Sequence, residues 1–248
     1  MTDRIQNNKT NKTLIIFDCD GTLVNTEFLS ADSYATSLHS ISDELKKYDA
    51  AALEKEFKGM QMGVSAQILI DRYALKTSTD EIILGYMQQA KINRAAHQEI
   101  IPGVKESLEK ISKDERFELC VASNSEYENI VASLEQAQLL EYFSADRIFD
   151  ASMVAAPKPS PLLFLHAAKT CGFEGQDCIV VEDTSVGTRA GKAAGYFVYG
   201  FTGCVADEHK LIEETALKNA KADKVFRNFI HIAGDIMSEE SDSYLMSA

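Results

Sequence analysis

The sequence predicts an α/β fold in which helices cover both faces of a mostly parallel sheet, with a helical segment inserted after the first strand. Two patterns predict this class. After residue 100, short apolar runs alternate with segments that have apolar residues at three- and four-residue spacing, as in repeated strand–helix units. Between Asn25 and Glu99 the helical spacing is uninterrupted, with no clear strand and no proline.

The first strand is predicted at Leu14 to Phe17, a β-branched and aromatic run too short for a helix. It leads into Asp18-Cys19-Asp20-Gly21-Thr22, where glycine and threonine break the strand into a tight turn. Ligands of open α/β sheets bind at the carboxyl ends of the strands. The turn is therefore the first candidate for a functional site.

The other elements follow from the same patterns. Helices of the inserted segment are predicted at Ala31 to Ile41, Ala50 to Phe57, Val64 to Tyr73 and Thr79 to Ala96. Later strands are predicted at Phe117 to Ala122, Arg147 to Phe149, Cys178 to Val181, Phe197 to Tyr199 and Lys224 to Phe226. Later helices are predicted at Val104 to Ile111, Glu126 to Leu139, Pro161 to Cys171, Ser185 to Ala194 and Phe229 to Met237. We expect residues 1–24 and 100–248 to form a core domain and residues 25–99 a helical domain.

Composition narrows the possible partners. The chain of 248 residues is 45% hydrophobic and 25% charged, which predicts a sizeable packed core. Its net charge is −13 and no basic run stands out, so nucleic acid and anionic membranes are poor partner candidates. An acidic protein that binds a phosphorylated substrate needs local positive charge, which a metal ion and a few lysines can supply.

The cysteines and the two ends of the chain indicate a compartment. Five cysteines are scattered singly with no C-x-x-C pair, which is typical of reduced thiols in a cytoplasmic protein. Met1 to Lys12 is polar, unlike a signal peptide, and Ser238 to Ala248 is predicted to be a loose polar tail. No stretch approaches 18 apolar residues, so no membrane-spanning helix is expected.

Asp18 and Asp20 are spaced for shared chemistry. Residues i and i+2 of an extended chain point to the same side, so the two carboxylates would meet at one site. A divalent cation relieves their repulsion, and Mg²⁺ prefers oxygen ligands of this kind. The alternative is a solvated turn or a helix cap. Cys19 points the other way and is interpreted as a small core residue.

Three later strand ends also offer polar groups. Ser123-Asn124-Ser125 would place a hydroxyl and backbone N–H groups at a helix start, where one residue is expected to be the N-cap and phosphate can bind. Lys158 lies between prolines in "PKPSP", which restrict the chain; the alternative is an exposed loop lysine. Glu182 and Asp183 end a buried strand, where adjacent acids need a compensating cation; the alternative is an Asp183 cap with Glu182 exposed.

The string "FDCDGTLVNTE" resembles the first motif of the haloacid dehalogenase-like phosphohydrolases. The three later strand ends are similar to this family's second, third and fourth motifs and occur in the same order. The resemblance covers Leu14 to Phe226, most of the chain. It implies a Rossmann-like core with a helical cap domain inserted after the first motif, as expected for residues 25–99.

The resemblance also implies catalytic roles. Asp18 would attack phosphorus and form an aspartyl-phosphate, and Asp20 would be the general acid and base. Mg²⁺ would be bound by the Asp18 carboxylate, the Asp20 backbone carbonyl and Asp183. Glu182 would be either a closer or an outer partner of the metal.

The phosphate would be bound by the remaining motif residues. Ser123 and the Asn124 backbone would contact phosphate oxygens, with Lys158 on the opposite side. Family dehalogenases lack an acid at the position of Asp20, so its presence favours phosphoryl transfer. A non-catalytic phosphoester-binding protein is a further alternative, but binding alone does not need a general acid.

Two subgroups compete within the family. β-Phosphoglucomutases have a histidine soon after the first motif and an arginine in the cap loop, whereas Phe28 to Leu38 lacks histidine and Phe57 to Gly63 lacks arginine. A hydrolase is therefore preferred to a mutase. The strings "FDCDGTLV", "FKG" and "LFLHAAK" resemble bacterial sugar-phosphate phosphatases, especially the 6-phosphogluconate type. The expected partner is a small phosphorylated metabolite, and the expected state is a monomer or weak dimer.

Substrate selection is assigned to the cap loop. Lys58 and Gln61 are the candidates, since a lysine there would meet an anionic or hydroxyl-rich substrate. The alternative for both is a solvated loop.

Overall fold

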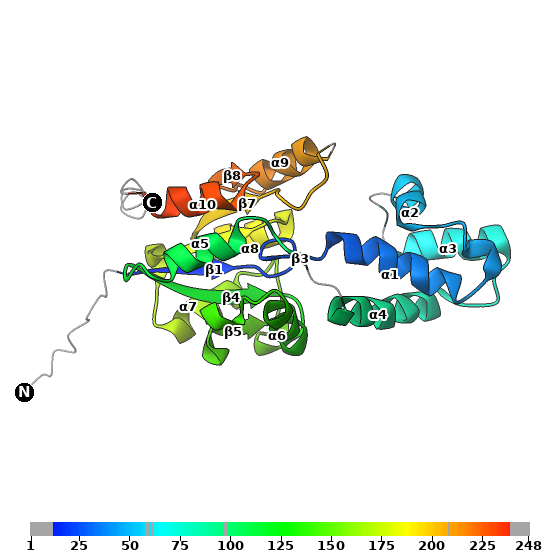
Figure 1. Ribbon diagram of the computed structural model, residues 1–248, viewed down its shortest axis with the longest axis horizontal. Helices are drawn as coiled ribbons and strands as arrows, with labels where there is room; N and C mark the ends of the chain where they lie inside the picture. The colour runs from blue at the N-terminus through cyan, green and yellow to red at the C-terminus, as the bar shows by residue number, and fades with distance from the viewer. Residues whose placement is uncertain (1–11, 58–59, 61, 97–98, 208, 239–248) are drawn as a thin grey trace, which may run out of the picture.

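A six-stranded parallel sheet forms the centre of the protein in a computed structural model, which describes residues 12–57, 60, 62–96, 99–207 and 209–238 (Figure 1). The strand order is β5-β4-β1-β6-β7-β8, and every adjacent pair is parallel. The predicted α/β fold is confirmed. The sheet consists of β1 Thr13–Phe17, β4 Phe117–Ser123, β5 Ile148–Asp150, β6 Cys178–Glu182, β7 Phe197–Phe201 and β8 Lys224–Phe226.

Strand β1 lies in the middle of the sheet. Phe17 pairs with Val121 of β4 on one side and with Val181 of β6 on the other. All five residues of β1 are buried, as expected of a parallel strand covered on both faces. Ile15 and Phe17 belong to one hydrophobic layer, and the intervening residues Leu14 and Ile16 belong to the other. The residues that follow β1 are therefore attached to a strand that is packed on both faces.

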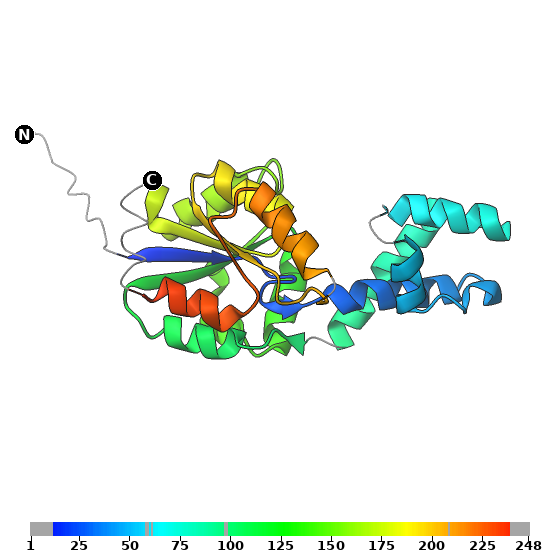
Figure 2. The same ribbon diagram turned by 90° about the horizontal axis from the view of Figure 1, so that it is seen from above.

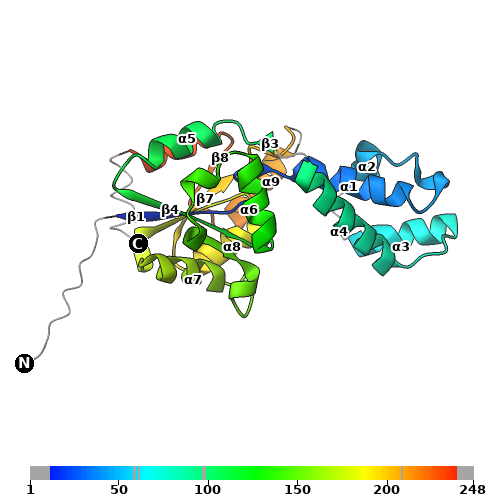
Figure 3. The ribbon, with the colours of Figure 1, turned by 60° about the horizontal axis from the view of Figure 1, so that its bottom comes forward.

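Helices cover both faces of this sheet, with α5 and α7 on opposite sides (Figure 3). One face is covered by α5 Val104–Ile111, α6 Tyr127–Gln136 and α10 Phe229–Ile236. The other is covered by α7 Leu162–Cys171, α8 Ser185–Ala193 and α9 Lys210–Asn219. Short 3-10 turns occupy Asp43–Leu45, Leu140–Tyr142, Ala145–Arg147, Ala151–Met153 and Gly175–Asp177.

Four helices form a separate bundle beyond the carboxyl ends of the sheet strands (Figures 1 and 2). They are α1 Glu27–His39, α2 Ala50–Phe57, α3 Met62–Tyr73 and α4 Thr79–Ala96. The bundle has its own hydrophobic cluster, which includes Leu38, Leu69 and Ile82 and contains no residue of the sheet. On this ground we propose that residues 25–99 form a cap domain.

Two short strands connect the cap to the core. β2 Val24–Asn25 pairs antiparallel with β3 Glu99–Ile100. The expectation that the segment from Asn25 to Glu99 contains no strand is therefore wrong at both of its ends. A two-residue strand is too short to give a periodic signal in the sequence.

Helix α9 was not among the predicted elements. Only Leu217 of this helix is buried, while Leu211 and Ile212 are 69% and 62% exposed. Its apolar residues therefore do not form one face, and the amphipathic pattern is weak. Helix α6 ends at Gln136, earlier than the predicted Leu139, and a 3-10 turn follows.

The segments expected to be polar tails lie almost wholly outside the described residues, which begin at Lys12 and end at Ser238. In the part of the chain that is described, no helix combines the length and apolarity that crossing a membrane requires.

Candidate active site

The predicted site residues meet at the carboxyl edge of the three central strands. Asp18 follows β1, Ser123 ends β4 and Glu182 ends β6, and these strands are adjacent in the order β4-β1-β6. Lys158 enters from the loop that precedes α7 and lies 2.6 Å from Asp18. The parallel register thus brings together groups that are up to 164 positions apart in the sequence.

A tight turn positions the first motif. The Asp18 N–H donates to Val181 O at 2.9 Å, and the Leu23 N–H donates to Cys19 O at 2.9 Å. Gly21 has a φ of +80°, which glycine adopts readily. A Cβ atom on Gly21 would lie 2.1 Å from Asp183 Oδ2. Only glycine therefore lets the Asp183 carboxylate approach this turn.

Lys158 forms a buried ion-pair triad with two carboxylates. Its Nζ donates to Asp18 Oδ1 at 2.6 Å and to Glu182 Oε1 at 2.8 Å. The three side chains are only 3%, 10% and 2% exposed, in the order Lys158, Asp18, Glu182. The ammonium also lies 4.6 Å from the ring centroid of Phe164, a favourable cation–π distance. The alternative of an exposed loop lysine is wrong.

The side chain of Asn124 fixes the backbone at Lys158. Asn124 Nδ2 donates to Lys158 O at 3.2 Å, and Asn124 Oδ1 accepts from Lys158 N at 3.0 Å. The sequence predicted a role only for the Asn124 backbone. No local pattern indicates the side-chain contact, since the partners are 34 residues apart.

Glu182 orients Lys158 and is itself held in place by Thr184. Its Oε2 accepts from both the N–H and the hydroxyl of Thr184 at 2.8 Å, while Oε1 accepts from Lys158. A Cβ on Gly187 would lie 1.6 Å from Glu182 Oε1, so α8 needs glycine there. The alternative of an exposed Glu182 beside an Asp183 cap is wrong, because Glu182 is 1% exposed and Thr184 is the N-cap.

Asp20 is oriented by a residue to which the sequence assigned no role of its own. Ser125 Oγ donates to Asp20 Oδ2 at 2.5 Å. The neighbouring Ser123 is buried, and its Oγ accepts from the Ser125 N–H at 3.2 Å. That hydroxyl hydrogen remains available for a phosphate oxygen. The expected N-cap among these residues is wrong, since α6 has Glu126 at that position with no side-chain cap.

The charges at the site do not balance. Burial raises the pKa of Asp18 to about 7 in spite of the opposing effect of Lys158, and Glu182 and Asp20 raise it further. Burial and the charges of Glu182 and Asp18 raise the pKa of Asp183 well above its usual value. Burial alone would lower the pKa of Lys158, but its two carboxylate partners outweigh that effect and raise it. The acids at this strand edge therefore outnumber the positive charge available to them.

A divalent cation would compensate this excess of negative charge. The Asp18 and Asp183 carboxylates, together with the Asp20 backbone carbonyl that the family resemblance implies, would give an all-oxygen set of the kind that Mg²⁺ prefers. Thr22 Oγ1 donates to Asp183 Oδ1 at 3.2 Å and orients that carboxylate. Within the described ranges, no three Asp, Glu, His or Cys side chains gather as a complete metal cage. Mg²⁺ usually keeps several waters and needs only one or two carboxylates, so two side chains and a carbonyl suffice.

The two cap candidates cannot be placed. Lys58 and Gln61 lie outside the described residues, between the end of α2 at Phe57 and the start of α3 at Met62.

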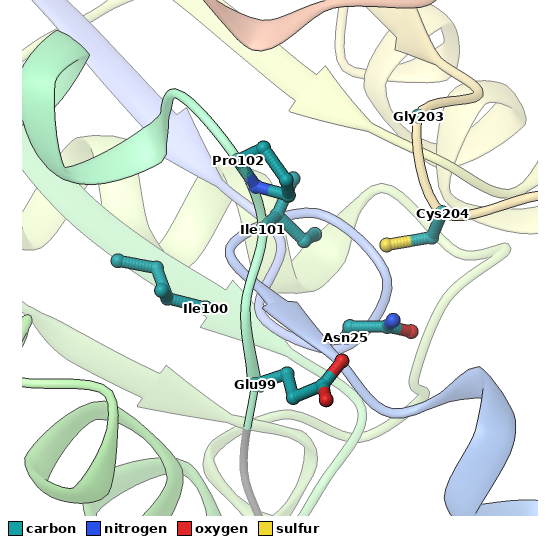
Figure 4. Close-up of a pocket in the computed structure, with 7 residues that line it drawn as sticks. All are labelled: Asn25, Glu99, Ile100, Ile101, Pro102, Gly203 and Cys204. Carbon is teal, nitrogen blue, oxygen red and sulfur yellow. The ribbon is translucent and has the colours of Figure 1, made fainter.

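A pocket of about 520 Å³ lies beside the short strands β2 and β3 (Figure 4). Asn25 and Glu99 line it from β2 and β3, and Gly203 and Cys204 line it from the loop after β7.

Comparison with known proteins gives one family. Residues 12–195 match the haloacid dehalogenase-like hydrolases. A protein named 6-phosphogluconate phosphatase from Escherichia coli is 29% identical over 197 residues, covering 79% of this chain and 83% of its own. A protein named β-phosphoglucomutase from Bacillus subtilis is 24% identical over 193 residues, covering 75% and 81%.

The fold is found among solved structures as well. A conserved haloacid dehalogenase-like protein of unknown function from Agrobacterium tumefaciens superposes with a TM-score of 0.73 and 27% identity. The alignment covers 91% of this chain and 97% of that protein. The similarity thus includes the helical bundle and not only the sheet.

Proposed function

Because the chain belongs to the haloacid dehalogenase-like hydrolase family, we propose that it is a Mg²⁺-dependent phosphomonoester hydrolase acting on a small phosphorylated metabolite. The observation that carries this proposal is the buried contact of Asp18 with Lys158 at 2.6 Å, with Asp20 two residues further on. A nucleophile, a fixed positive charge and a second carboxylate are the groups that transfer of a phosphoryl group through an enzyme carboxylate requires.

Asp18 is proposed as the nucleophile that attacks phosphorus in line and forms an aspartyl-phosphate. Its backbone is fixed by β6 and its side chain by Lys158, so it loses little freedom on reaching the attacking position. Bound Mg²⁺ supplies the positive charge that favours ionised Asp18 and offsets the charge of the phosphoryl group. Lys158 and the Ser123 hydroxyl bind phosphoryl oxygens.

Asp20 is proposed to move the proton. It protonates the leaving oxygen of the substrate and then deprotonates the water that releases phosphate. The hydrogen bond from Ser125 orients its carboxylate without supplying a positive charge. This leaves Asp20 able to exchange a proton in both steps.

The substrate class is proposed to be sugar phosphates, with 6-phosphogluconate as the first candidate. The name of the Escherichia coli relative and the resemblance of the "LFLHAAK" helix support it. Lys58 and Gln61 stay our candidates for substrate selection. The net charge of −13 argues against nucleic-acid substrates, and the absence of any disulfide among the five cysteines is consistent with a cytoplasmic enzyme. We expect it to be a monomer or weak dimer.

A mutase is the alternative function. The Bacillus subtilis relative supports it, but the missing histidine after the first motif and the missing cap arginine oppose it. A non-catalytic phosphoester binder is a weaker alternative, since the Asp18 and Asp20 pair is intact.

A panel assay tests the proposal. Phosphate release is measured with Mg²⁺ for 6-phosphogluconate, hexose phosphates, nucleoside monophosphates and phosphoglycolate. We expect release, with sugar phosphates ranked first. Interconversion of glucose phosphate isomers in the presence of a bisphosphate, without phosphate release, would support the mutase instead.

A further inference from the structure

Three of the five cysteines gather on the sheet face that α7 and α8 cover. Cys120 lies in β4, Cys178 begins β6 and Cys171 is the last residue of α7. All three belong to or pack against one hydrophobic cluster. Cys120 and Cys178 are fully buried, whereas Cys171 is half-buried. The catalytic proposal uses none of them.

Cys171 lies near a second thiol and a guanidinium. It packs against the hydrophobic cluster that contains Cys120, and it interacts electrostatically with the Cys120 thiol and the Arg147 guanidinium. Arg147 Nη2 donates to Glu118 at 2.6 Å, while Nη1 is buried and has no conventional hydrogen-bond acceptor among the described residues. The guanidinium is thus placed to stabilise a negative charge on Cys171 sulfur.

The surroundings make the two thiols unequal. The Cys120 thiol and the Arg147 guanidinium lower the pKa of Cys171 to about 7, against the effects of burial and of Glu118. Burial raises the pKa of Cys120. A half-accessible thiolate beside an enclosed thiol is the arrangement of an attacking and a resolving cysteine.

We propose that Cys171 and Cys120 form a thiol pair that hydrogen peroxide oxidises to a disulfide. The Cys171 thiolate attacks a peroxide oxygen, so that an S–O bond forms, the O–O bond breaks and the leaving oxygen departs as water. Sulfur is oxidised to a sulfenic acid and the peroxide is reduced. Cys120 sulfur then attacks Cys171 sulfur, the S–O bond breaks, and the hydroxyl leaves as a second water with the Cys120 proton. Two thiols and one peroxide give one disulfide and two waters.

Cys178 is the competing partner, and its environment disfavours it. Burial raises its pKa to about 12, against the opposing effect of the Tyr196 hydroxyl. Cys120 instead lies in β4, against which α7 packs, and α7 ends at Cys171. The packing of the two elements therefore favours the bond between α7 and β4.

Such a bond would link two segments that serve the active site. β4 ends at Ser123, three residues after Cys120, and α7 directly follows the loop that contains Lys158. The test of this thiol pair does not depend on the proposed catalytic function, because it measures the masses of peptides and not turnover.

The test oxidises the full-length reduced protein with graded hydrogen peroxide, blocks remaining thiols and maps peptides. Trypsin leaves Cys171 and Cys178 on one peptide, residues 170–189, so cleavage after Glu174 with a glutamate-specific protease is added to separate them. We expect the Cys120–Cys171 disulfide to be the first oxidation product. A Cys171–Cys178 bond, or oxidation of Cys204 before Cys171, would overturn the proposal.

Three cysteine variants test which thiol attacks the peroxide and which one resolves the sulfenic acid. In Cys120→Ala we expect a sulfenic acid at Cys171 that dimedone traps, and in Cys171→Ser no disulfide at Cys120. Cys204→Ser is the matched control and should form the bond as the wild type does. Circular dichroism checks that each variant is folded.

The acidity of the Cys171 thiol can be measured on the wild-type protein. Isotope-coded alkylation over a pH series should give half-maximal labelling of Cys171 near pH 7. At pH 7 its thiolate fraction should exceed that of an ordinary thiol roughly 15-fold, and the lower nucleophilicity of an acidic thiolate should reduce the rate advantage to about three-fold. A midpoint above pH 8.5, typical of an unperturbed thiol, would contradict the account.

Discussion

Lys158 is the residue on which the charge balance of the site depends. We predict that Lys158→Met lowers turnover by about 10²- to 10³-fold, since it removes a fixed charge from the transition state. It should also lower the free energy of unfolding by about 3–5 kcal/mol, because Asp18 and Glu182 lose their buried cation. Steady-state kinetics and urea unfolding measure the two effects.

The matched control is Lys192→Met. Lys192 lies 2.6 Å from Asp223, and both side chains are 29% exposed. Removing this partly solvated pair should change the unfolding free energy by about 1 kcal/mol or less and leave turnover unaltered. Equal losses in both variants would show that the buried triad has no special role.

Gly21 and Gly172 separate backbone strain from crowding at the site. Both have positive φ, +80° and +83°, so alanine should strain either backbone by about 1–2 kcal/mol. A Cβ at Gly21 meets Asp183, whereas nothing lies within 4 Å of one at Gly172. Gly21→Ala should therefore weaken Mg²⁺ activation in a metal titration of activity, and Gly172→Ala should only lower the melting temperature. Unchanged Mg²⁺ activation in Gly21→Ala would refute the assignment of Asp183.

Some residues of the site have a recognisable local sequence pattern, whereas contacts between distant residues do not. Asp18, Ser123 and Asp183 were predicted because each ends or follows a strand, and Lys158 because it lies between prolines. The contacts of Ser125 with Asp20 and of Asn124 with Lys158 connect residues 105 and 34 positions apart. Only the parallel register of the sheet brings such pairs together, so no local pattern predicts them.

At the scale of elements, Gly187 of helix α8 leaves room for a side chain of the site, whereas Gly234 of helix α10 does not border the site. A Cβ at Gly187 of α8 would collide with Glu182, while one at Gly234 of α10 meets nothing within 4 Å. Gly187→Ala should displace Glu182 and reduce turnover. Gly234→Ala should raise the unfolding free energy by about 0.5–1 kcal/mol, as alanine replaces glycine in a helix. Similar activities of the two variants would contradict this role of α8.

The cap helices are predicted to unfold independently of the sheet. Leu69→Ala removes a fully buried side chain from the cap cluster and should destabilise it by about 2–5 kcal/mol. Hydrogen exchange should then accelerate in α1, α3 and α4 but not in β1 and β4. The control Leu84→Ala removes a side chain that is 56% exposed on α4 and should change neither. Faster exchange in both cap and sheet would argue against a separate cap domain.

The elements that the sequence failed to predict share a cause. β2 and β3 have two residues each, and α9 buries only Leu217. Their positions depend on tertiary contacts rather than on their own periodicity. Long elements with a full apolar face, such as α5 and β4, were predicted to within one residue at each end.

At the scale of the whole molecule, the family resemblance of four separated motifs is confirmed by the match over residues 12–195. A single motif would be compatible with a solvated turn. Four motifs in order, three at the ends of adjacent parallel strands and one in the loop before α7, indicate both the sheet topology and the composition of the site. The substrate is not specified in this way, because the residues that we propose for substrate selection, Lys58 and Gln61, lie in the helical segment and not in the sheet.

The central claim is that Asp18 is a metal-assisted nucleophile. The most direct measurement is phosphate release from the preferred ester by wild type and Asp18→Asn, each with Mg²⁺ and with EDTA, alongside a melting curve. The account predicts release only in wild type with Mg²⁺, and at least about a 10³-fold loss in Asp18→Asn with a folded protein. Substantial release by folded Asp18→Asn, or release by wild type in EDTA, would contradict it.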